Sequence, residues 1–143
     1  MEMITAYKEF GYGAIAITDH DTWTPIPEVE GIIVFQGCEH SRGEHWLEIK
    51  GDNEVLRIKA HPNRYGDTCQ EIDRGNWDCI ECTEHATPHY EYLKCQTPAI
   101  CTDDAHNLNM VGHAYIVVEV NELTKDAIIK SIKERRYALG GIL

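Results

Sequence analysis

Short apolar runs alternate with polar segments along most of this chain. The clearest runs lie at residues 14–17 and 32–35, and each is a continuous apolar stretch of strand length followed by polar residues. Such runs are typical of strands that are covered on both faces of a sheet. The same reading predicts further strands at 46–49, 55–60, 78–82, 99–102 and 114–120.

Helical spacing is clearest near the end of the chain. A helix is predicted over 124–137, because Thr124 suits an N-cap and three isoleucines then share one apolar face, namely Ile128, Ile129 and Ile132. The spacing of Ile4, Tyr7 and Phe10 predicts an opening helix, and shorter helices are expected near 68–74 and 86–93. Many short strands between polar segments and helices favour an α/β sheet or barrel with loops gathered at one end.

Length and charge narrow the class of protein. A chain of 143 residues with 43% hydrophobic and 26% charged residues suits one globular domain, 1–143. The formal net charge of −11 disfavours general binding to nucleic acids or anionic membranes. No apolar run reaches the roughly 18 residues of a membrane-spanning helix. The acidic start does not look like a secretion signal, so a cytoplasmic location is expected.

Six cysteines allow more than one interpretation. Their even number is compatible with three disulfides, and Cys79 and Cys82 with Cys95 and Cys101 resemble a four-cysteine structural zinc site. However, residues three apart on a strand point to opposite faces, which argues against zinc at 79 and 82. Reduced, buried cysteines that act as small apolar side chains are the favoured interpretation.

Possible metal ligands follow four of the predicted strands, in a chain with 8 histidines and 24 carboxylates. In α/β sheets and barrels the carboxyl ends of the strands converge on one crevice. Imidazoles and carboxylates there would suit Zn, Mn or Fe. The candidate cluster consists of His20, Glu39, His61, Asp104 and His106.

These segments carry a family resemblance. Residues 11–22, Gly-Tyr-Gly-Ala-Ile-Ala-Ile-Thr-Asp-His-Asp-Thr, resemble the second motif of the PHP (polymerase and histidinol phosphatase) superfamily. The motifs that follow in the family's order are Gly37-Cys38-Glu39, His45, Ala60-His61-Pro62 and Asp104-Ala105-His106. The resemblance implies an incomplete or distorted (β/α)7-type barrel with two or three divalent metal ions (Zn, Mn or Fe). It implies as ligands His20, Glu39, His45, His61, Asp104 and His106.

One feature departs from the family pattern. The family opens with a strand that ends in His-x-His, but no histidine precedes His20 here, so the first barrel strand is expected to be absent. A second chain or an upstream segment would then supply the strand, or the chain is a shortened relative with two metals or fewer. The exposed edge of strand 14–17 predicts a homodimer, or a C-terminal segment, 138–143, that folds back across the gap.

The resemblance implies hydrolysis of a phosphate ester by metal-activated water, with a small phosphorylated metabolite or nucleotide as substrate. His61 and Asp104 are the expected catalytic residues, although the sequence does not select among His61, His45 and an unassigned neighbour as proton donor. Arg42 and Arg64 are expected to bind the phosphate. The remaining histidines are expected at the surface or behind the ligands: His40, His85, His89 and His113. The alternative is a non-catalytic metal-binding or interaction module derived from a PHP domain.

Overall fold

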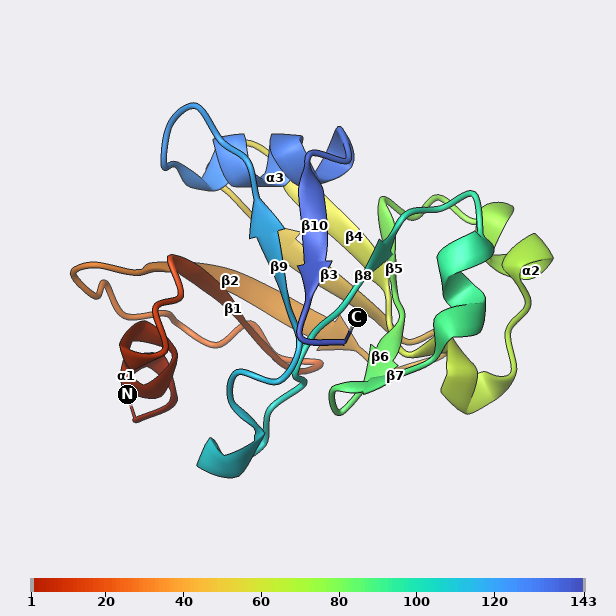
Figure 1. Ribbon diagram of the computed structural model, residues 1–143, viewed down its shortest axis with the longest axis horizontal. Coiled ribbons are helices and arrows are strands. Elements are labelled where there is room, and N and C mark those ends of the chain that lie inside the picture. Colours follow the sequence, from red (N-terminus) through yellow and green to blue (C-terminus); the bar gives the residue numbers. More distant parts are fainter. Residues whose placement is uncertain (1, 143) are drawn as a thin grey trace.

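The computed structural model describes residues 2–142 (Figure 1). Its elements in chain order are α1 (Glu2–Glu9), β1 (Ala14–His20), β2 (Ile33–His40), β3 (Trp46–Lys50), β4 (Val55–Lys59), the 3-10 helix η1 (Pro62–Tyr65), α2 (Cys69–Asp73), β5 (Cys79–Glu81), β6 (Thr83–Glu84), β7 (Thr87–Pro88), η2 (Tyr90–Lys94), β8 (Ala99–Ile100), η3 (Leu108–Met110), β9 (Tyr115–Val118), α3 (Lys125–Lys133) and β10 (Tyr137–Gly140). None of the helices in this range is long and apolar enough to cross a membrane.

A six-stranded curled sheet forms the centre of the fold, in the order β1-β2-β3-β4-β5-β8. The pairs β1–β2, β4–β5 and β5–β8 are parallel, whereas β3 is antiparallel to both of its neighbours. Strands β1, β2, β4, β5 and β8 therefore end at one edge of the sheet, and β3 begins there. The predicted α/β class is confirmed, while the seven-stranded form of the barrel stays a prediction.

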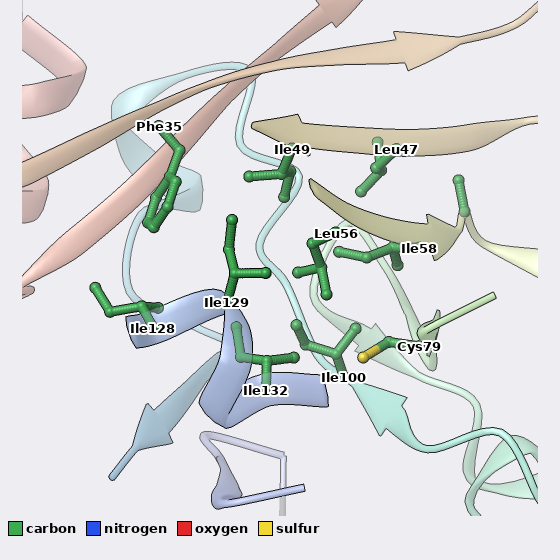
Figure 2. Close-up of a cluster of buried hydrophobic side chains, with 11 residues drawn as sticks. Phe35, Leu47, Ile49, Leu56, Ile58, Cys79, Ile100, Ile128, Ile129 and Ile132 are labelled. Carbon is green, nitrogen blue, oxygen red and sulfur yellow. The ribbon is translucent and has the colours of Figure 1, made fainter. Parts of the chain in front are cut away.

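The main core lies between this sheet and α3 (Figure 2). Alternate residues of β3 and β4 point to the same side, where they meet the isoleucine face of α3. The core side chains labelled in Figure 2 are Phe35, Leu47, Ile49, Leu56, Ile58, Cys79, Ile100, Ile128, Ile129 and Ile132. Each of them is less than 10% exposed, so this cluster is the largest apolar contribution to the stability of the fold.

The predicted start of the last helix is confirmed, but its predicted end is wrong. The Thr124 hydroxyl accepts a hydrogen bond from the N–H of Ala127, as an N-cap does. The helix stops at Lys133, and Arg135 adopts a positive φ of 62°, which reverses the chain. Tyr137 then begins β10, whose strand pairs with β9.

Three further expectations were wrong. The residues of β1 are half-buried or exposed rather than covered on both faces, although its position at the edge of the sheet is as predicted. The C-terminal residues pair with β9, not with the free edge of β1. The segment predicted as a helix at 86–93 contains β7 and part of η2, since Pro88 has no N–H to donate within a helix. The homodimer stays a prediction.

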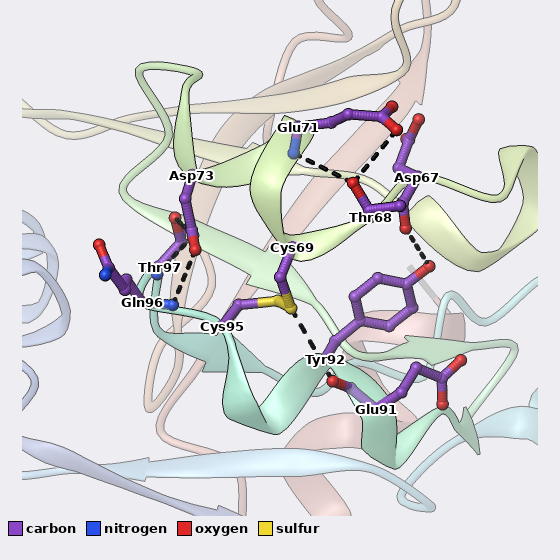
Figure 3. Close-up of a disulfide and its surroundings, with 10 residues drawn as sticks. All are labelled: Asp67, Thr68, Cys69, Glu71, Asp73, Glu91, Tyr92, Cys95, Gln96 and Thr97. Atoms are coloured by element: carbon purple, nitrogen blue, oxygen red, sulfur yellow. Dashed lines mark hydrogen bonds between the residues drawn. A yellow bond between two sulfur atoms is a disulfide. The ribbon is translucent and has the colours of Figure 1, made fainter.

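The cysteines divide into two groups. Cys69 on α2 and Cys95 after η2 form a disulfide with a Cα–Cα distance of 5.1 Å (Figure 3). The interpretation of all six as reduced was therefore wrong for this pair, which is separated by 26 positions in sequence. It agrees with the other four, Cys38, Cys79, Cys82 and Cys101, which are free and buried.

Candidate metal centre

The shared edge of the sheet brings together side chains that are distant in sequence. His20 ends β1, Glu39 is the penultimate residue of the parallel strand β2, and the two lie opposite each other in the register. The Oε2 atom of Glu39 lies 3.4 Å from Nδ1 of His20 and 3.6 Å from Nε2 of His61, which follows β4. Glu39 and His61 are buried, so this carboxylate and this imidazole are held away from bulk water.

Glu39, His45 and His61 form the first cluster. One ligand atom from each lies within 4.8 Å of the others. His45 joins the cluster because it directly precedes β3, the strand that begins at this edge. The Nδ1 atoms of His45 and His61 are buried and have no hydrogen-bond partner. Buried orphan imidazole nitrogens beside a carboxylate fit a divalent ion, since three protein ligands leave coordination positions open.

His85, Asp104 and His106 form the second cluster, again with ligand atoms within 4.8 Å of one another. Asp104 and His106 lie in the loop after β8, and His85 lies in the turn between β6 and β7. The Nδ1 atom of His85 is 3.4 Å from Oδ2 of Asp104. His85 is exposed, as expected of a surface residue, but its contact with Asp104 was not predicted, because no spacing in the sequence relates residue 85 to 104.

The charges of the two clusters influence each other. Burial raises the pKa of Asp104, and the negative charge of Glu39 raises it further. Burial by itself would raise the pKa of Glu39, but the interactions with the nearby imidazoles of His61 and His20 outweigh it and lower this pKa. Burial and the charge of His61 lower the pKa of His45, which favours the neutral imidazole that binds metals.

Glu81 on β5 is a buried carboxylate that sequence reasoning missed as part of the site. Its Oε1 accepts a hydrogen bond of 2.9 Å from the backbone N–H of His61, and its other oxygen accepts one from the hydroxyl of Thr102. Burial raises its pKa to about 7, against these hydrogen bonds. Glu81 thus joins the turn after β4 to the segment after β8, and its one sequence signal is a carboxylate inside an apolar strand.

Three cluster residues adopt positive φ angles, which are uncommon for side chains with a Cβ. The angles are 21° at His61, 48° at His85 and 48° at Asp104. Backbone strain of this kind is concentrated at functional sites, where surrounding contacts hold it in place. The hydrogen bond that the His61 N–H donates to the Glu81 carboxylate is one such contact.

The two arginines expected to bind phosphate lie outside both clusters. The Nε atom of Arg64 donates to Oε2 of Glu84 at 2.6 Å, so its guanidinium is already paired with a carboxylate. Arg42 is exposed in the loop after β2. His20, the remaining predicted ligand, lies beside Glu39 without belonging to either group of three.

Two comparisons with known proteins found similarities to this chain. Residues 96–137 match the family model described as PHP-associated. The fold is similar to a two-domain protein from Bacteroides vulgatus ATCC 8482 that contains a predicted PHP-like metal-dependent phosphoesterase, with a TM-score of 0.71 and 15% identity. The alignment covers 96% of this chain and 59% of that chain, so this chain spans well under two thirds of that protein. No curated protein matches the sequence.

The family model covers less than half of this chain, and the structural similarity is one of fold; both findings agree with the resemblance to the PHP superfamily that the sequence motifs carry.

Proposed function

We propose that this chain is a metal-dependent phosphoesterase that hydrolyses a small phosphorylated metabolite or a nucleotide. The observation that supports this most strongly is the presence of two groups of three possible metal ligands, each with its ligand atoms within 4.8 Å of one another. The similarity to a protein that contains a predicted PHP-like phosphoesterase supports the same class of reaction.

The first cluster, Glu39, His45 and His61, would hold one divalent ion, and the second, His85, Asp104 and His106, would hold another. Bound there, divalent ions supply a water that is acidic near neutral pH and a positive charge for the phosphoryl oxygens. His61 is 2% exposed, which suits ion binding better than proton transfer to a leaving group. Of the two expected catalytic residues, Asp104 is half-buried and lies nearer to solvent.

Two matched glutamate variants test this proposal. Glu39→Gln removes a carboxylate that lies beside His20 and His61, whereas Glu48→Gln removes one that pairs with His40 at 2.9 Å outside both clusters. Elemental analysis of protein loaded with Mn or Zn should show metal lost from Glu39→Gln only. Phosphate release from a panel of phosphomonoesters and nucleotides should fall with it.

Two outcomes would contradict the proposal in different ways. Unchanged metal content in Glu39→Gln would show that the ligand assignment is wrong. Bound metal in the parent without turnover of any phosphoester would favour the alternative, a non-catalytic metal-binding or interaction module.

A further inference from the structure

A small pocket opens beside the first cluster and shares His45 with it. Its volume is about 230 Å³, which suits a small chemical group rather than a whole drug-sized ligand. The lining residues are Gly43, Glu44, His45, Lys59, Tyr65 and Asp67. Lys59 is the cation of this lining, and it lies two residues before His61 on the same chain segment.

The ammonium of Lys59 is buried, and its two carboxylate neighbours among the described residues, Glu44 and Asp67, both lie beyond direct hydrogen-bond distance. Its side chain is 4% exposed, and Nζ lies 3.7 Å from Oε1 of Glu44 and 3.6 Å from Oδ2 of Asp67. Both distances exceed those of direct hydrogen bonds. The ring of Trp77 lies 5.8 Å from the same ammonium. Burying an ammonium without direct hydrogen bonds costs free energy. A ligand that accepts hydrogen bonds from the N–H groups of Lys59 would therefore bind favourably.

We propose that this pocket binds a phosphate group of the substrate and that Lys59 is the residue that binds it. The inference rests on the proposed phosphoesterase function and deepens it. Lysine binds phosphate as a compact point charge and needs no bidentate geometry. The role that sequence reasoning assigned to Arg64 falls to Lys59, because the guanidinium of Arg64 is engaged by Glu84.

Glu44 makes room for the anion. Its side chain is 69% exposed, and it follows Gly43, whose φ of 89° lies in the left-handed region that glycine favours. The carboxylate can therefore move into solvent when phosphate takes its place beside Lys59. Asp67, which is 23% exposed, stays as the counter-charge of the lysine.

This arrangement makes two substitutions act in opposite directions. Lys59→Gln removes the ammonium that binds the anion, so phosphate binding should weaken roughly ten- to a hundredfold. Glu44→Gln removes a carboxylate that competes for that ammonium and repels phosphate, so binding should tighten a few-fold. General damage to the fold would weaken binding in both variants.

The experiment is calorimetric titration of the purified chain with inorganic phosphate, with and without Mn. Lys50→Gln is the matched control, because Lys50 is an exposed lysine 4.1 Å from the ring of Trp23 and does not line the pocket. Its dissociation constant should stay within about twofold of the parent value. Lys59→Arg keeps the charge and should retain most of the binding.

Several results would overturn the inference. They are a parent chain that binds no phosphate, a Lys59→Gln variant that binds it as tightly as the parent, or a Glu44→Gln variant that binds it more weakly. If Lys59→Gln fails to fold, NMR of the lysine ammonium groups in the parent decides instead. The Lys59 resonance is assigned as the one that is missing in Lys59→Arg. It should shift when phosphate is added, and an unchanged resonance would contradict the proposal.

Failure here is distinguishable from failure of the proposed function. If the chain binds phosphate through Lys59 but turns over no phosphoester, the phosphate site is supported and the proposed phosphoesterase activity is contradicted. If the chain does turn over a phosphoester and Lys59→Gln leaves its KM unchanged, only the role of Lys59 is contradicted.

Discussion

Asp103 and Asp104 are adjacent in sequence, but their carboxylates lie in different surroundings. Asp103 is buried and accepts hydrogen bonds from the N–H groups of Gly112, His113 and Ala114 at 2.7, 2.8 and 2.6 Å, and from the hydroxyl of Tyr7 at 2.8 Å. Asp104 instead lies beside His85 in the second cluster. Asp103 therefore holds the loop that presents Asp104.

We expect Asp103→Asn and Asp104→Asn to separate stability from metal binding. The side-chain amide in Asp103→Asn would present an NH2 group to backbone N–H donors that need an acceptor. Each donor left unpaired lowers the free energy of unfolding by about 1–3 kcal/mol. Thermal melting should show a clear loss of stability for Asp103→Asn and little change for Asp104→Asn. Metal content should fall in Asp104→Asn. The opposite pattern would show that the structural and ligand roles are exchanged.

Tyr65 is expected to position His45. Its hydroxyl lies 3.0 Å from Nε2 of His45, which leaves the buried Nδ1 as the free ring nitrogen. Such partners of metal-binding histidines contribute about 10- to 100-fold to metal affinity. Because Tyr65 is half exposed, Tyr65→Phe should weaken Zn binding by about tenfold, measured by competition with a chelator.

Tyr90→Phe is the control for that measurement. The hydroxyl of Tyr90 donates to the carbonyl of Ile142 at 2.6 Å, and this contact involves neither cluster. Zinc affinity should be unchanged in this variant. An equal loss of affinity in both variants would argue against a specific role for Tyr65.

Asp126 in the first turn of α3 predicts a pH-dependent contribution to stability. Its carboxylate accepts hydrogen bonds from the N–H groups of Asn53 and Glu54, and these bonds lower its pKa below the ordinary 3.8. A carboxylate with a lowered pKa in the folded state stabilises the protein above its unfolded pKa and loses that effect as the pH falls through the folded value.

Asp126→Asn should therefore melt at a lower temperature than the parent at pH 7, and the difference should begin to shrink as the pH falls below 3.8 and disappear below the lower pKa of the folded state. Melting curves at several pH values check this. Asp52 is exposed in the turn between β3 and β4, the turn that also contains Asn53 and Glu54. Asp52→Asn should melt as the parent does at every pH. A difference that persists in acid would assign the effect to packing instead of charge.

The Cys69–Cys95 disulfide is expected to contribute to stability without being essential for folding. A sequence separation of 26 corresponds to roughly 3 kcal/mol of chain entropy in the unfolded state. The Asp73 carboxylate also accepts hydrogen bonds from the N–H groups of Gln96 at 3.0 Å and Thr97 at 2.9 Å, so the two segments stay joined after reduction (Figure 3).

Reduction should lower the melting temperature of the parent and leave the double variant Cys69→Ser, Cys95→Ser unaffected. Thiol titration of the denatured chain should find four thiols before reduction and six after it. Six thiols without reductant would contradict the disulfide. Stable disulfides are typical of oxidising compartments and rare in the cytoplasm. A confirmed disulfide would therefore count against the expected cytoplasmic location.

The sequence by itself determined most of the strands, the capped start of the last helix and the candidate ligands that follow the strands. These features are local: an apolar run, an N-cap such as Thr124 or a His after a strand is visible within a few neighbouring residues. The convergence of Glu39 and His61 was also predictable, because parallel strands present their carboxyl ends at one edge.

The tertiary structure alone decided which distant residues complete the site. His85 meets Asp104, Glu81 holds the His61 turn, and Lys59 lies in a pocket beside His45, all through contacts between separate segments. The Cys69–Cys95 bond and the pairing of β10 with β9 have the same origin. Such contacts depend on how the loops pack after the sheet has curled, and residue spacing along the chain does not encode that distance.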